Sequence, residues 1–88
     1  MISFAKDIRP LFSIREIQCM KTPGVRLDDY SYMADDQGGG DFPDHANARN
    51  VLVYLTGAKQ PRMPPGGPYW STSNLEKFET WMTDGFQP

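Results

Sequence analysis

The sequence predicts a small all-α domain. Apolar residues recur at helical spacing in three separate segments, and no segment alternates apolar and polar residues over the length that a strand needs. Glycine and proline gather between those segments, which is typical of loops. With 88 residues and no internal repeat or linker, we expect one domain over residues 1–88. The predicted architecture is three main helices, one short helix and long loops.

Residues 4–20 are predicted to form the first helix, because apolar side chains such as Phe4 and Ile8 recur in it at helical spacing. Pro10 conflicts with an uninterrupted helix, since it lacks an N–H group and its ring clashes with the preceding turn. A helix that begins near Asp7, with Asp7 as its N-cap, would place Pro10 in the first turn, where proline is tolerated. A short turn followed by a kink is the alternative.

A short helix over residues 28–34 and a long loop follow. Asp28 is the expected N-cap of this helix, because its carboxylate can accept from the first free N–H groups. The side chains expected to pack are Tyr30, Tyr32 and Met33. Residues 35–41 include three consecutive glycines, which makes regular structure costly there and predicts a loop.

Residues 45–56 form the best-defined predicted helix in the middle of the chain. Asp44 is its expected N-cap, and Gly57 is expected to end it. Its apolar side chains recur at helical spacing and form one stripe, made of Ala48, Val51, Leu52 and Leu55. Such a stripe is typical of a helix that packs one face against a core.

The last predicted helix follows a loop rich in proline and glycine. Residues 60–68 contain four prolines and two glycines, a composition that excludes a helix. Ser73, with Glu76 three residues later, predicts a capping box at the start of the last helix. Its predicted buried side chains are Leu75, Phe78, Trp81 and Met82. Gly85 is expected to end it.

The composition argues against several function classes. The net charge is −2 and the positive side chains are scattered, so we expect no binding to nucleic acid. One cysteine, Cys19, and one histidine, His45, cannot build a cysteine-rich cluster or a two-histidine site. We therefore expect no metal site and no catalytic residues. We interpret His45, with Asp41 and Asp44 beside it, as part of a solvated first helical turn.

The sequence has no apolar segment suited to a membrane or to export. It lacks a stretch of about 18 apolar residues, so no membrane association is predicted. Its first residues include an acidic one, Asp7, and no long apolar run, unlike a secretory signal. If Met1 is the true start, these features predict a cytoplasmic protein.

Three sequence segments resemble one protein family. SFAKDIRPLF covers residues 3–12, PRMPPGG covers residues 61–67, and a helix containing Trp81 and ending at Gly85 closes the chain. They resemble the opening, the distal-ligand loop and the C-terminal helix of class I cytochrome c domains of a bacterial group that has a DIRPLF opening and an RMPPGG loop. The resemblance implies a cytochrome c-like fold.

The resemblance stops at the haem-attachment motif. Domains of this family attach haem through CxxCH, in which two thiolates form thioethers and the histidine binds iron. Aligned on its cysteine, this chain has Glu16 in place of the first cysteine and Met20 in place of the histidine, so Cys19 alone is retained. Met63 stands at the position of the distal methionine ligand. The main prediction is therefore a domain without haem or any other cofactor.

Two arrangements of the former haem region stay open. In one, haem c is held by a single thioether at Cys19, with Met20 and Met63 as axial ligands. In the other, side chains fill the region, Cys19 is a small buried residue, and the two methionines fill gaps. The aromatic side chains available to fill it are Tyr30, Tyr32, Phe42, Tyr69 and Trp70.

The predicted function is that of a haem-free, non-catalytic accessory subunit or interaction module. It would dock on a larger enzyme, such as an oxidoreductase, in a hetero-oligomer and stabilise it. The rigid proline-rich loop is the predicted partner-binding surface, since little entropy is lost when such a loop binds. Its candidate residues are Arg62, Met63, Pro64, Pro65, Tyr69 and Trp70. The alternative is an electron-transfer protein with atypical haem c ligation.

Overall fold

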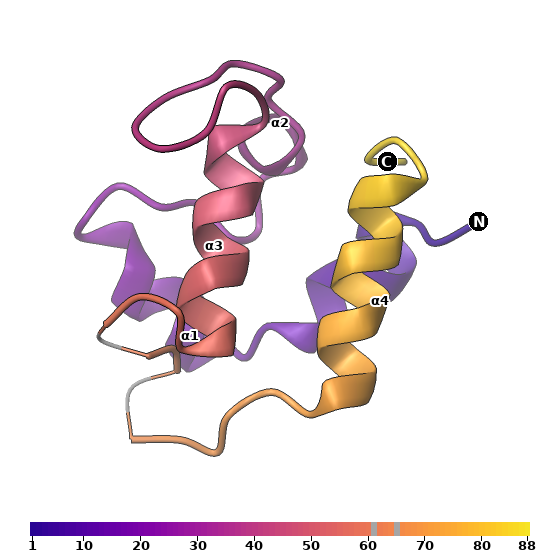
Figure 1. The fold of residues 1–88 in the computed structure, drawn as a ribbon. Helices are drawn as coiled ribbons and strands as arrows, with labels where there is room; N and C mark the ends of the chain where they lie inside the picture. The colour runs from indigo at the N-terminus through magenta and orange to yellow at the C-terminus, as the bar shows by residue number, and fades with distance from the viewer. Residues whose placement is uncertain (61, 65) are drawn as a thin grey trace.

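In the computed structural model, which describes residues 1–60, 62–64 and 66–88, the chain consists of helices and loops (Figure 1). Its helical elements are η1 (Phe4–Ile8), η2 (Arg9–Leu11), α1 (Ile14–Lys21), α2 (Tyr30–Met33), α3 (Ala46–Thr56) and α4 (Thr72–Thr83). Within the described residues, the only β-type pairing is an isolated bridge between Gly39 and Phe42. The predicted all-α class is confirmed.

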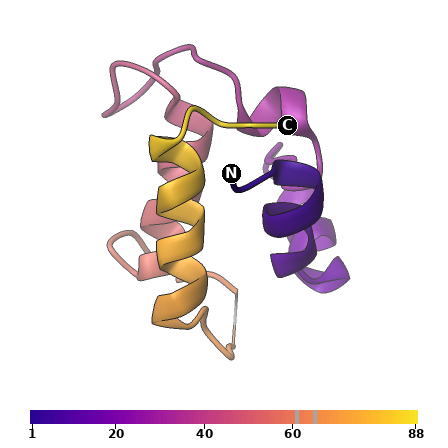
Figure 2. The same cartoon turned by 90° about the vertical axis from the view of Figure 1, so that its right-hand side faces the viewer.

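Helix α4 packs against two other helical elements of the chain. It packs against α3 and against η1, and the short helix α2 packs against α3 (Figure 1 and Figure 2). The two ends of the chain lie close together: the Phe4 N–H donates to the Gln87 carbonyl at 2.9 Å, and the Ser3 hydroxyl donates to the Pro88 carbonyl at 2.8 Å. These bonds place η1 beside the end of the chain that follows α4.

The N-terminal segment is not the single helix predicted over residues 4–20. After η1 and η2, which contains Pro10, the backbone becomes extended at Phe12 and Ser13 before α1 begins. Ser13 starts α1 through a capping box: its hydroxyl accepts from the Glu16 N–H, and the Glu16 carboxylate accepts from the Ser13 N–H. Pro10 and the Ser13 capping box together divide the segment. The predicted alternative, a short turn followed by a kink, is therefore closer to the observed structure than one helix is.

Four helices begin at a cap other than the predicted one, and that of α3 is His45 rather than Asp44. The observed caps of η1, α2 and α4 are Ser3, Asp29 and Ser71. The residues predicted for these places are Asp7, Asp28 and Ser73. Each of these three observed caps has an extended backbone and a side-chain oxygen that accepts a free N–H of the first turn. Ser73 lies inside α4, so the capping box predicted with Glu76 does not form.

The predicted apolar faces of α3 and α4 are confirmed in large part. Their fully buried members are Ala48, Val51, Leu55, Phe78 and Trp81. The other predicted members, half-buried against the core, are Leu52, Leu75 and Met82. Helix α3 ends at Gly57, as predicted, and Gly85 follows α4; both glycines have left-handed backbones. No helix of the described residues is long and apolar enough to cross a membrane.

Aromatic side chains form the centre of the core. Phe78 and Trp81 of α4 are both completely buried. Three aromatic rings meet the ring of Phe78 at steep angles, with centroid distances of 6.4, 6.1 and 5.6 Å for Phe12, Trp70 and Trp81. Because edge-to-face pairs add stabilisation to that of area burial, this cluster holds α4 to the segments before α1 and before α4 itself.

Candidate functional site

A cavity of about 540 Å³ lies between α3 and the segment that links α1 to α2. Helix α3 contributes one wall, with Asn47, Asn50, Val51, Tyr54 and Leu55. The opposite side is lined by Phe12 and by residues between 20 and 32, and Met63 completes the lining. Its volume falls within the range of about 300–1,000 Å³ that is typical of small-molecule sites.

The walls of the cavity are mainly apolar. Among the residues that the structure describes, no charged side chain lines it. Its polar groups are two tyrosine hydroxyls and two amides, and the Asn47 amide already donates to the Tyr32 carbonyl at 3.0 Å. Burial raises the pKa of the Tyr32 phenol above its ordinary value of 10.0. The site therefore suits a neutral, largely apolar occupant.

Met20 and Met63, the axial ligands in the alternative that has a bound haem, line this same cavity. Met63 is buried, and its N–H donates to the Tyr54 carbonyl at 2.9 Å, which fixes it beside α3. Met20 is half-buried in the last turn of α1. The fold thus brings together two thioethers that are far apart in the sequence, at residues 20 and 63.

Most of the aromatic side chains named as candidates to fill the former haem region do not line this cavity. The aromatic side chains proposed for that role are Tyr30, Tyr32, Phe42, Tyr69 and Trp70. Of these, Tyr32 alone lines the cavity among the described residues. Tyr30 instead donates its hydroxyl to the Phe86 carbonyl at 2.6 Å, and Trp70 packs on Phe12 in the aromatic core.

Cys19 is exposed and does not line the cavity, so its prediction as a small buried residue is wrong. The buried face of α1 carries Glu16 and Ile17, and Met20 continues it one turn later. Cys19 stands outside this stripe, because successive helical residues turn by about 100°. A thioether from Cys19 to a group held in the cavity therefore does not fit the helix as it is folded.

Glu16 is a buried carboxylate, only 5% exposed, at the base of α1. One of its oxygens accepts from the Ser13 N–H at 3.0 Å, and the other accepts from the Trp70 indole N–H at 3.2 Å. The spacing of Ser13 and Glu16 is the sequence signal from which this capping box could be found. Glu16 thus joins the start of α1 to the segment before α4 through these two hydrogen bonds.

The proposed partner-binding loop is only partly accessible. Met63 and Trp70 are buried, so they are corrected from surface candidates to core residues. Arg62 and Pro64 are half-buried, Tyr69 is 48% exposed, and Pro65 lies outside the described residues. The Arg62 guanidinium lies over the Tyr69 ring, 4.3 Å from its centroid, and this cation–π contact stiffens the exposed ring.

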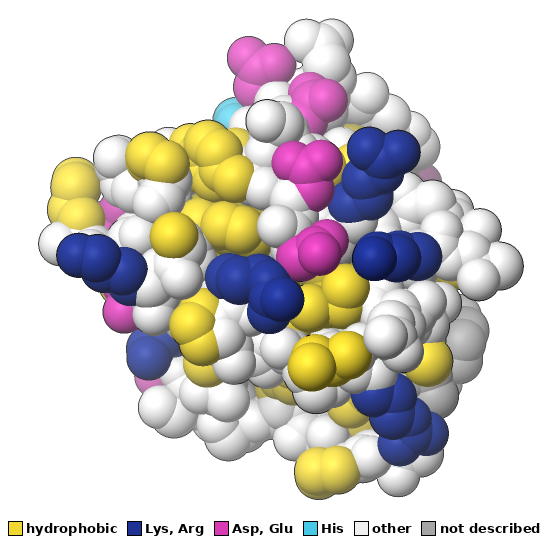
Figure 3. All heavy atoms as spheres, turned by 180° about the vertical axis from the view of Figure 1, so that it is seen from behind, with side chains coloured by type: hydrophobic (Ala, Val, Ile, Leu, Met, Phe, Trp, Pro, Cys, Tyr) yellow, Lys and Arg dark blue, Asp and Glu magenta, His cyan; other side chains and the backbone are white. Residues whose placement is uncertain are grey.

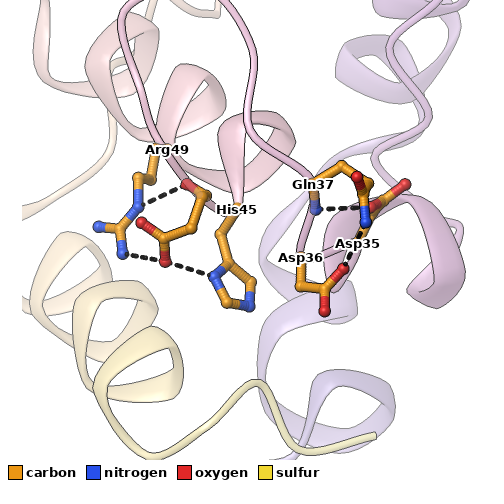
Figure 4. A network of polar contacts seen from close by, with 6 residues as sticks. Asp35, Asp36, Gln37, His45 and Arg49 are labelled. Carbon is orange, nitrogen blue, oxygen red and sulfur yellow. Dashed lines mark hydrogen bonds and ion pairs between the residues drawn. The ribbon is translucent and has the colours of Figure 1, made fainter.

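A cluster of polar side chains around His45 lies at the start of α3 (Figure 4). The His45 Nδ1 lies 2.7 Å from the Asp44 carboxylate, to which Arg49 also donates at 3.1 Å. The His45 ring stacks on Phe86 with centroids 4.0 Å apart. Hydrogen bonds from His45 and then from Arg49 hold the pKa of Asp44 below its ordinary value of 3.8.

This cluster has a structural role at the start of α3. Asp44 is not the N-cap, contrary to prediction; His45 occupies that place with a left-handed backbone, φ 48°, and makes no side-chain cap. The Asp44 carboxylate is instead hydrogen-bonded to the side chains of His45 and Arg49. Within the described residues, no group of three or more His, Cys, Asp or Glu side chains could hold a metal ion.

The charged side chains do not gather into one field on the face drawn in Figure 3. Lysine and arginine side chains lie apart from one another there, with carboxylates and apolar groups between them. The ion pairs of the described residues include Arg49 with Asp44, close in the sequence, and Lys59 with Asp41, farther apart in it. The face drawn in Figure 3 therefore offers a phosphate backbone no continuous basic surface.

No protein-family model matches the chain, and none of the curated proteins or solved structures compared with it gives a significant match.

Proposed function

We propose that this chain is a haem-free, non-catalytic module with a cytochrome c-like fold, and that it docks on a larger enzyme, such as an oxidoreductase, as an accessory subunit. The observation that carries the proposal is the state of the two positions that would hold haem thioethers. Glu16 is buried and bonded to Ser13 and Trp70, and Cys19 faces away from the cavity.

Covalent haem does not fit these two positions. A carboxylate that satisfies the buried Trp70 N–H is costly to remove, because this donor would lose its partner. The other position offers a thiol, but on the wrong face of α1. A scaffold that resembles a redox domain without its attachment chemistry is better suited to packing on a partner than to carrying electrons.

Tyr69 is the side chain best placed to contact such a partner. It is a large aromatic residue, 48% exposed, in a loop that proline restricts. The Arg62 guanidinium holds its ring from one side. Aromatic anchors that are already ordered lose little entropy on binding and dominate the affinity of many interfaces.

The docking proposal predicts that Tyr69→Ala weakens binding to the partner without unfolding the chain. Tagged wild-type and variant chains are purified from cells of the source organism, and the co-purified protein is quantified. Truncation of an aromatic anchor costs about 2 kcal/mol or more, which corresponds to a loss of affinity of roughly thirtyfold. Ile14→Ala is the matched control, because Ile14 is a large side chain that is 70% exposed on α1.

The outcomes separate clearly. Loss of one stoichiometric protein with Tyr69→Ala, but not with Ile14→Ala, supports docking through this loop. A wild-type chain that is recovered alone and remains a stable monomer contradicts the proposal. Equal recovery of the same partner with the wild type and both variants would show that Tyr69 is not part of the interface.

An electron-transfer protein with atypical haem ligation is the second candidate. One observation favours it: Met20 and Met63, both able to bind iron through sulfur, line a single cavity. This candidate predicts a Soret band that shifts in Met63→Ala. A band that stays with the chain after acid–acetone extraction would establish covalent attachment and overturn the haem-free proposal.

A further inference from the structure

The cavity beside α3 has no role in the docking proposal. We propose that it is a binding site for a small, uncharged and mainly apolar molecule that carries one hydrogen-bonding group, which Asn50 recognises. This inference does not depend on a partner protein, because every wall named below belongs to this chain.

The size of the cavity is the first argument. Protein interiors are close-packed, and unfilled apolar volume lowers stability because its lining atoms lose their contacts. A chain of 88 residues has little stability to lose. A space of about 540 Å³ within it is far larger than a packing defect and has the dimensions of a ligand site.

The absence of charge on the described walls determines the class of ligand. A charged molecule would lose its hydration without gaining an opposite charge, which is strongly unfavourable. Apolar groups meet Phe12, Leu27 and Val51, whose buried side chains present no polar atom. Met20 and Met63 can adjust to ligand shape, since a thioether chain is flexible and polarisable.

Helix α3 supplies the polar contact. Asn47, Asn50 and Tyr54 follow helical spacing and line the cavity on one face of the helix. The Asn47 amide is already bonded to the Tyr32 carbonyl. Among the described residues, no hydrogen bond uses the Asn50 side chain or the hydroxyls of Tyr32 and Tyr54, so these groups are available to a ligand, and Asn50 is the amide among them. An amide both donates and accepts, which suits an alcohol, a carbonyl or a neutral amide.

Binding can be tested on the full chain with a neutral apolar fluorophore, N-phenylnaphthylamine. We expect saturable binding of one probe per chain. Asn50→Trp, which fills the cavity from α3, should abolish it or weaken it at least about tenfold. Val53→Trp is the matched control, because Val53 is half-buried on the same helix but does not line the cavity. Thermal unfolding of both variants shows whether each is folded.

The position of the probe can be read from methionine methyl resonances. Bound probe should shift the signals of Met20 and Met63, whereas Met33, buried away from the cavity, should not move. This readout keeps the test decisive if Asn50→Trp fails to fold. Binding that shifts Met33 but neither cavity methionine would overturn the proposal, as would the absence of saturable binding to the wild-type chain.

The neutral character of the ligand has its own test. Decanol and decanoate have the same chain length and differ in the charge of the head group at neutral pH. We expect decanol to displace the probe at least about tenfold more effectively, because the carboxylate would be desolvated without a partner. Equal displacement by decanoate, or by dianionic haemin at similar concentration, would refute the selectivity for uncharged molecules.

Discussion

Glu16 shows how a single residue can connect two distant parts of this chain. Its two carboxylate oxygens bind the backbone of Ser13, three residues earlier, and the indole of Trp70, 54 residues later. The first bond caps the start of α1. The second holds Trp70, in the segment before α4, against α1. The local bond is visible in the sequence as a capping pattern, whereas the long-range bond has no sequence signal.

We predict that Glu16→Ala lowers the free energy of unfolding by about 1–3 kcal/mol, because the buried Trp70 N–H loses its acceptor. Glu16→Gln should lose less, since its amide oxygen still accepts one bond. Urea unfolding followed by circular dichroism measures both changes. Glu76→Ala, at an exposed position of α4, is the control and should change stability by less than about 0.5 kcal/mol. If Glu16→Ala leaves the free energy of unfolding unchanged, the hydrogen bonds of Glu16 contribute nothing to stability.

Asp44 makes stability depend on pH at the acidic end. Because His45 and Arg49 hold its pKa below the ordinary 3.8, the folded chain keeps the carboxylate charged where the unfolded chain protonates it. Its contribution is therefore complete above 3.8 and is lost as the pH falls through the lowered pKa. Asp44→Asn should remove this part of the pH dependence.

Melting temperatures measured from neutral to acidic pH can test this effect. The wild type should lose more stability than Asp44→Asn in the acidic range. Asp28→Asn is the control, since Asp28 is exposed and next to the cap of α2 without being the cap. If Asp44→Asn follows the wild-type curve throughout, the bonds to His45 and Arg49 do not affect stability.

The ends of the elements depend on close contacts as well as on backbone conformation. Gly57 ends α3 with φ 85°, and a Cβ built there would lie 2.8 Å from the Arg62 side chain. Gly24 has a similar φ of 92°, with nothing within 4 Å of its Cβ position. The two glycines therefore separate the effect of conformation from that of packing.

We predict that Gly24→Ala lowers the free energy of unfolding by about 1–2 kcal/mol, the cost of a left-handed alanine. Gly57→Ala should cost more, because Arg62 must also move away from its position over Tyr69. Chemical unfolding of both variants, and of Gly57→Ala combined with Arg62→Ala, measures the difference. Equal losses at the two glycines would mean that Arg62 moves at no cost.

The helices could be predicted from the sequence, but several of their ends could not. Apolar periodicity found α3 and α4 because burial of a stripe is the main force that stabilises them. Caps are less certain, since neighbouring residues of the same type compete: Ser71 begins α4 rather than Ser73. The break before α1 was indicated by Pro10 and by the Ser13 and Glu16 pair, which outweighed the apolar spacing across them.

The candidate site could be predicted only where it rests on the chain's resemblance to a family. That resemblance singled out Met20 and Met63, and both line one cavity. It also led to a buried Cys19, which is wrong because α1 begins later than predicted and turns the thiol outward. Asn50 and the cavity itself have no sequence signal, because they depend on how three distant segments meet.

At the scale of the whole molecule, stability depends on the aromatic core around α4. We predict that Phe78→Ala lowers the free energy of unfolding by about 3–5 kcal/mol, since Phe78 is fully buried among Phe12, Trp70 and Trp81. That is a large share of the roughly 5–15 kcal/mol of a typical small domain. Calorimetry or urea unfolding measures it.

Phe42→Ala is the control for this loss, because Phe42 is half-buried and lies outside the core cluster. It should lower stability clearly less than Phe78→Ala. Similar losses for the two phenylalanines would show that the cluster around α4 is no more important than the loop before α3.

Hydrogen bonds between the two ends of the chain hold the N-terminus and the C-terminus close together. Ser3 and Phe4 are joined to Pro88 and Gln87 by hydrogen bonds of 2.8 and 2.9 Å, so a short peptide would be enough to link the termini covalently. New ends could then be opened at an exposed loop residue such as Gly40. Any addition at either terminus also emerges at the same place, beside η1.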